Sequence, residues 1–243
     1  MNDKSSKGFY NKIHSENDHY GAERNYYSWA GNFHRYRIKI FKDIFKNIVR
    51  YNESTTILDV GCSKTVLGEV FYDNKHPLIE AFDISDVVIE KTKQIYPYMK
   101  FFVADAQEFS CNDKKDVVFA GEIIEHLEYP GKAFRNWANC VKDNGYMIMS
   151  TPNKVFNRKN KEHVSLLGMR DVKDLAEDNK LRIIKIIGID VLNDIFDPTF
   201  GKILNKLNSR FLYNLYSLII KNRLKISYNI PAIATNIIYV FQK

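Results

Sequence analysis

Apolar residues along the middle of the chain form short continuous runs that alternate with segments of helical periodicity. The continuous runs predict strands, at residues 55–60, 78–85, 100–106, 116–121, 146–153, 181–191 and 234–243. Apolar residues at spacings of three and four predict helices, at residues 35–50, 66–72, 86–96, 130–143 and 170–180. This alternation predicts a parallel sheet covered by helices on both faces.

The length of 243 residues suits one such α/β domain and is short for two. We expect residues 1–50 to form an N-terminal helical lid segment rich in aromatic side chains, and residues 51–243 to form the main domain. A helical insertion is expected at about 192–233, where lysines and arginines flank an apolar stripe. It is expected to pack on the core or roof a pocket; contact with a membrane surface or a second copy is the alternative.

Ligands of parallel sheets bind at the carboxyl ends of the strands, so the residues after each strand carry the functional prediction. The first strand ends in Asp59, and Gly61, Cys62 and Ser63 follow it. A glycine there lets the backbone approach a ligand closely, although a single glycine is often only a turn. The spacing of a phosphate-binding P-loop is absent, because Ser63 stands before Lys64 where glycine is required.

Acids also follow the next strands. Asp83 and Ile84 end the second strand, where a carboxylate accepts hydrogen bonds from ribose hydroxyls, or begins the next helix. Asp105 and Ala106 end the third strand, and Glu122 follows the fourth. Together these acids and the glycine turn predict an adenosine-binding site.

Composition narrows the partners without selecting one. The formal charge of +7 favours anionic partners: phosphorylated metabolites, nucleic acid or an acidic membrane surface. Three cysteines without a C-x-x-C pair argue against a disulfide framework or a zinc ribbon. The polar N-terminus and the lack of long apolar runs predict a soluble, cytoplasmic protein.

These residues resemble the class I S-adenosylmethionine-dependent methyltransferases, in particular the group of ubiquinone-biosynthesis and sugar O-methyltransferases. The resemblance covers about residues 50 to 190 and the last strand, through LDVGCS, FDIS, FVADAQEF, DVVFAGEIIEHLEYP and YMIMSTPN. It implies a Rossmann-like sheet of seven strands, mostly parallel, with the last antiparallel and helices on both faces. It implies S-adenosyl-L-methionine as cofactor, bound by Asp59, Gly61, Cys62, Ser63, Asp83, Ile84, Asp105, Ala106 and Glu122.

The glycine-rich turn of the family usually reads G-C-G-x-G, and here Ser63 and Thr65 fill its later glycine positions. Thr65 stands where the family has its last turn glycine, and a β-branched residue resists positive φ. This departure leaves a further interpretation open, in which the protein is a non-catalytic relative that only binds the cofactor.

The acceptor is expected to be a small or carrier-linked metabolite with negative charge, such as a sugar, glycan or lipid intermediate, methylated on oxygen. His126 and His163 are the candidate general bases, and no metal is expected. A metal-dependent RNA 2′-O-methyltransferase is the alternative, because Glu122, Glu125 and the two histidines resemble a divalent-metal site. The oligomeric state does not follow from the sequence.

Overall fold

The computed structural model describes residues 7–16, 29–72, 76–155, 163–191 and 226–243. Most of the predicted insertion at 192–233 and much of the predicted lid at 1–50 lie outside these ranges. The described part of the lid segment consists of α1 (Lys7–Glu16), α3 (Trp29–Asp43) and the π-helical turn η1 (Ile44–Val49).

Seven strands form one sheet in the order β3-β2-β1-β4-β5-β7-β6. The strands are β1 (Thr56–Val60), β2 (Leu78–Asp83), β3 (Lys100–Val103), β4 (Lys115–Gly121), β5 (Val141–Pro152), β6 (Arg182–Val191) and β7 (Ala234–Gln242). β7 runs antiparallel to both its neighbours, while the pairs from β3 through β5 are parallel. The order reverses beside β1, so the ends of β1 and β4 open a crevice for a ligand. The predicted Rossmann-like sheet with an antiparallel last strand is confirmed.

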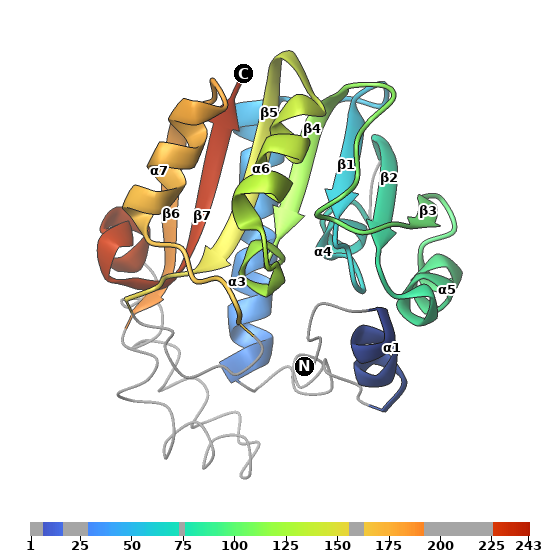
Figure 1. Ribbon diagram of the computed structural model, residues 1–243. Helices are drawn as coiled ribbons and strands as arrows, with labels where there is room; N and C mark the ends of the chain where they lie inside the picture. The colour runs from blue at the N-terminus through green and yellow to red at the C-terminus, as the bar shows by residue number, and fades with distance from the viewer. Residues whose placement is uncertain (1–6, 17–28, 73–75, 156–162, 192–225) are drawn as a thin grey trace, which may run out of the picture.

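Helices cover both faces of the sheet (Figure 1). One core contains buried side chains of α3, η1, α4 (Val66–Val70) and α5 (Asp86–Ile95) against one face. The other contains those of α6 (Pro130–Asn139) and α7 (Met169–Asp178). Buried Ala133, Phe134, Trp137 and Ala138 recur at helical spacing along α6, which explains why this segment folds against the sheet. Short 3₁₀ turns are η2 (Ile124–His126) and η3 (Pro231–Ile233).

The helix predicted at 130–143 ends earlier, at Asn139. The Cys140 carbonyl accepts a hydrogen bond from Lys115 N–H, and Val141 pairs with Lys115, so the chain joins the sheet before Gly145. Cys140 also forms a disulfide with Cys111, with 5.3 Å between the Cα atoms. The sequence analysis argued against a disulfide framework and did not anticipate this single bridge, which leaves the buried Cys62 as the free cysteine.

Within the described ranges, no helix has the length and apolar character needed to cross a bilayer.

Candidate functional site

The turn after β1 is built on residues with left-handed backbone angles. Gly61 has φ +61°, and a Cβ there would lie 2.5 Å from Ile123 Cγ1. Ser63 and Thr65 also adopt positive φ, 45° and 44° respectively. Thr65 therefore adopts the positive φ that a β-branched residue resists, and the backbone is strained at this position.

Two buried acids hold this turn. The Thr65 hydroxyl donates to Asp59 Oδ2 at 2.5 Å. Ser63 N–H donates to Asp83 Oδ2 at 3.0 Å, and Ser85 N–H donates to Asp83 Oδ1 at 2.9 Å. The strained turn is thus fixed to the ends of β1 and β2, which keeps its backbone in place beside the crevice.

Burial perturbs both carboxyls. Loss of water raises the pKa of Asp59 to about 7, while the Thr65 hydrogen bond opposes the rise. Burial also raises the pKa of Asp83, against the opposing N–H groups of Ser85 and Ser63. A cationic ligand entering here would favour the ionised forms of both.

A cavity of about 200 Å³ lies over the ends of β2, β3 and β4. Asp83, Ile84, Asp105 and Ala106 line it together with Gly61, Ser63, Glu122 and His126. Its outer wall is α1, which contributes Tyr10, Ile13 and His14. Figure 1 places α1 beyond the carboxyl ends of the parallel strands.

Polar contacts fix α1 to the start of α5. Asn11 accepts from the Ser85 hydroxyl at 2.7 Å and donates to Asp86 Oδ1 at 2.9 Å. Lys7 pairs with Asp86 at 2.5 Å, and Lys91 Nζ donates to the His14 carbonyl at 2.7 Å. These contacts hold α1 over the cavity.

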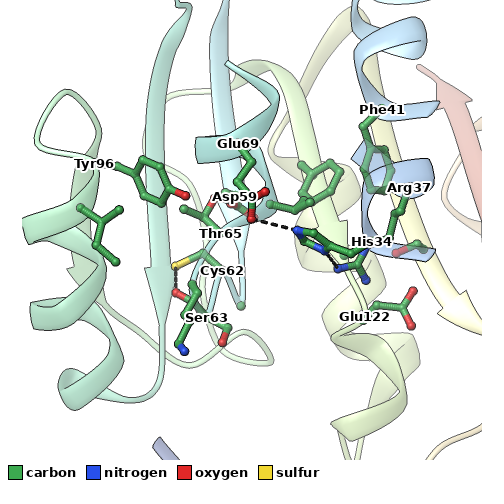
Figure 2. Close-up of a pocket in the computed structure, with 17 residues that line it drawn as sticks. His34, Arg37, Phe41, Asp59, Cys62, Ser63, Thr65, Glu69, Tyr96 and Glu122 are labelled. Atoms are coloured by element: carbon green, nitrogen blue, oxygen red, sulfur yellow. Dashed lines mark hydrogen bonds and ion pairs between the residues drawn. The ribbon is translucent and has the colours of Figure 1, made fainter. Parts of the chain in front are cut away.

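A second cavity of about 400 Å³ adjoins the first and shares Gly61, Ser63 and Glu122 with it. Figure 2 shows His34 and Arg37 projecting from α3 into it. His34 Nε2 lies 2.9 Å from Glu69 Oε1, and His34 Nδ1 lies 3.2 Å from Arg37 Nη2. Arg37 Nε is buried without a hydrogen-bond partner among the described residues, so a donor stands ready for an anionic group.

Glu122 stands where the two cavities meet. Its backbone has φ +54°, and its Oε2 accepts from Asn236 Nδ2 of β7 at 2.8 Å. Its Oε1 is buried and makes no hydrogen bond within the described ranges. Burial raises the pKa of Glu122, and the positive charge of Arg37 opposes that rise.

Both candidate bases lie next to a buried acid. Glu125 is 1% exposed, and its Oε1 lies 4.0 Å from His126 Nε2. The rings of His126 and His163 are 5.2 Å apart, and the Glu125 carbonyl accepts from the N–H groups of Val164 and Ser165. Burial, and then the charge of Glu122, raise the pKa of Glu125 well above its usual value.

All nine residues expected to bind the cofactor line one of the two cavities. His126 lines the smaller cavity, and His163 lies beside His126. The sequence analysis missed Arg37, His34, Glu69 and Asn236. Arg37 was detectable only as a cation one helical turn before buried Phe41 in a predicted helix.

Comparison with known proteins identifies the family. Residues 31–197 match the methyltransferase domain family. The mitochondrial ubiquinone biosynthesis O-methyltransferase of Candida albicans is 26% identical over 113 residues, which cover 43% of this chain and 35% of that protein. The ubiquinone biosynthesis O-methyltransferase of Coxiella burnetii is 24% identical over 160 residues, covering 55% of this chain and 66% of that protein. The match thus spans less than two thirds of either relative.

Among solved structures, the N-methyltransferase NodS of Bradyrhizobium japonicum, crystallised with S-adenosyl-L-homocysteine, shares the fold. Its TM-score is 0.60 at 13% identity, with 87% of each chain covered. The family match spans more than half of the chain and includes the turn and acids that form the two cavities. This chain belongs to the methyltransferase domain family.

Proposed function

We propose that this enzyme methylates a hydroxyl group of a small or carrier-linked anionic metabolite, such as a sugar, glycan or lipid intermediate. The observation that carries the proposal is the position of His126, which lines the smaller cavity beside Glu122 and lies next to Glu125 and His163. A hydroxyl acceptor benefits from a general base of this kind. The relatives named as ubiquinone biosynthesis O-methyltransferases support an oxygen acceptor.

The residues of both cavities fit S-adenosylmethionine. Asp83 would accept from the ribose hydroxyls, while Asp105, Ala106 and Ile84 would border the adenine. The backbone at Gly61, Cys62 and Ser63, with Asp59, would lie under the methionine part. The buried, unpartnered Nε of Arg37 would donate to its carboxylate, and Glu122 would lie near the sulfonium. When bound, the cofactor supplies a methyl group on a good leaving group.

The protein contributes positioning and proton transfer. A proton taken from the acceptor hydroxyl by His126 would create an imidazolium 4.0 Å from Glu125 Oε1, and that positive charge would favour the ionised form of the buried Glu125 carboxyl. α1 closes the adenosine end of the cavity and restricts water. His163 either orients His126 or serves as the base itself.

Single substitutions separate these roles. If His126 is the base, His126→Ala should lower turnover by about 10²–10⁴-fold, while S-adenosylhomocysteine affinity measured by calorimetry changes little. His163→Ala tests the second imidazole in the same way. The assay is methyl transfer from labelled cofactor to a panel of hydroxylated metabolites, with and without acidic groups. Full activity in both variants would refute the general-base proposal.

One observation favours a second candidate, a metal-dependent RNA 2′-O-methyltransferase. Ligand atoms of Glu125, His126 and His163 all lie within 4.8 Å of one another, as a divalent cation requires. Glu122 is not part of this group. Titration of the protein with Mn²⁺, and methylation of RNA with and without it, distinguish the two candidates. Manganese-dependent methylation of RNA would replace the leading proposal.

A further inference from the structure

A row of positive charges follows the outer face of α3 and η1, away from both cavities. Lys39, Lys42, Lys46 and Arg50 are all exposed and recur at intervals of three and four residues. Residues at such intervals lie on one side of a helix. The row spans roughly 16 Å at about 1.5 Å per residue. We call these four residues the basic row.

No acidic side chain in the described part of the chain forms an ion pair with the basic row. None of its four side chains forms an ion pair or hydrogen bond with another described side chain, although the chain has several such pairs elsewhere. Asp43, an exposed acid of the same helix, accepts a hydrogen bond from Asn47 at 2.6 Å. The opposite side of the helix packs into the hydrophobic core through the buried side chains of Ile40, Phe41, Ile44 and Phe45.

A hollow of about 910 Å³ lies directly beside the row, lined by Lys42 and Lys46. Its wall includes the rings of Tyr51 and Phe71, whose centroids are 4.9 Å apart. Glu53 also borders it. The half-buried Tyr51 ring thus lines the same open groove as the two lysines.

We propose that the basic row and this groove form a binding surface for single-stranded nucleic acid. Cations in a line match a chain of phosphates, and an aromatic ring beside them offers a stacking surface for a base. A protein partner fits less well, because lysine is depleted and apolar side chains are enriched at the centre of protein interfaces. A flat lipid surface would use the charges but leave the groove unfilled.

The proposal is independent of the acceptor under Proposed function, because the surface lies outside the cofactor cavities. It requires only that a single-stranded nucleic acid bind along α3, whichever molecule receives the methyl group.

The test is fluorescence anisotropy with labelled 12-nucleotide oligo-uridine and oligo-thymidine across a range of salt concentrations. Each phosphate contact contributes about −0.7 to the slope of log affinity against log salt, so four contacts predict a slope of about −2.8. The triple variant Lys39→Ala, Lys42→Ala, Lys46→Ala should lower affinity about tenfold or more and reduce the slope to about −0.7.

A matched control removes the same charge elsewhere, through Lys93→Ala, Lys114→Ala and Lys173→Ala, all exposed. It should retain the wild-type affinity, and both variants should bind S-adenosylhomocysteine normally, which verifies folding. Tyr51→Leu should weaken oligonucleotide binding severalfold without changing the salt slope. Equal binding of both oligonucleotides indicates a surface for single strands of either RNA or DNA, whereas preference for oligo-uridine indicates a surface for RNA.

Three results would overturn the proposal. The first is no oligonucleotide binding at low salt, and the second is an equal loss in the control variant. The third is a pair of results: the protein binds vesicles of 30% phosphatidylserine through the basic row, and it does not bind oligonucleotides. That pair would identify the basic row as a membrane-binding surface.

Discussion

The hydrogen bond between Thr65 and Asp59 gives a sharp test of how the strained turn is held. Asp59 is 2% exposed, and its pKa rises from the ordinary 3.8 to about 7. Because folding raises the pKa of Asp59, its contribution to the free energy of unfolding falls as the pH rises from about 4 to about 7. Above about pH 7 this contribution no longer changes. A shift of this size corresponds to a loss on the order of 4 kcal/mol.

Thr65→Val removes the hydroxyl and keeps the β-branched shape at φ 44°. Since the hydroxyl lowers the pKa of Asp59, the variant should raise that pKa beyond about 7. At pH 5.5 Asp59 is protonated in both proteins, so the substitution should change the free energy of unfolding little at that pH. At pH 8.5 the ionised carboxylate loses its 2.5 Å donor, and the additional cost should be about 1–2 kcal/mol.

The assay is urea unfolding of wild type, Thr65→Val and Thr65→Ser at both pH values. The serine variant retains the hydroxyl, so its free energy of unfolding should follow the wild-type pH dependence. Other buried acids, such as Asp83, titrate in all three proteins and cancel in the comparison. A destabilisation by valine that is equal at the two pH values, or larger at pH 5.5, would refute the reasoning.

Further substitutions test the cavities. Gly61→Ala should destabilise the fold by about 1–3 kcal/mol and abolish S-adenosylhomocysteine binding in calorimetry, because its Cβ would lie 2.5 Å from Ile123; normal binding would contradict the role of this turn. Asp83→Ala should weaken that binding about tenfold or more, and unchanged affinity would exclude Asp83 as the ribose ligand. Asn11→Ala removes the two hydrogen bonds that Asn11 makes with Ser85 and Asp86 and should speed ligand release several-fold in stopped-flow measurements, with the thermal midpoint nearly unchanged. Ligand binding should also release protons from the buried acids, detected as a dependence of the calorimetric enthalpy on the buffer.

The residues that line the two cavities were predictable because their positions depend on local features of the chain. Continuous apolar runs define strands, and parallel strands place their ends at one edge. Asp59, Asp83 and Asp105 could therefore be grouped without knowing any contact between them. The same logic located His126, which follows β4 by a few residues.

The features that the sequence did not predict depend on contacts between residues far apart in the chain, which hydrophobic periodicity does not encode. Arg37 reaches the cavity because α3 packs across the sheet, and helical spacing reveals only the apolar side of that packing. Asn11 contacts Ser85 across 74 residues. Cys111 and Cys140, separated by 29 residues, meet because the chain after β3 passes beside the end of α6.

The acids at the strand ends therefore have two functions that depend on each other. Asp59 and Asp83 fix a turn in which Ser63 and Thr65 stand with positive φ, and the Thr92 hydroxyl adds a bond to the Ser63 carbonyl at 3.1 Å. Three polar contacts thus offset the strain that glycines would avoid. The same contacts take both carboxylates out of water, which makes them sensitive to any positive charge in the cavity. In this chain the departure from glycine leaves the turn in place beside the cavities, because the acids that line those cavities also hold the turn.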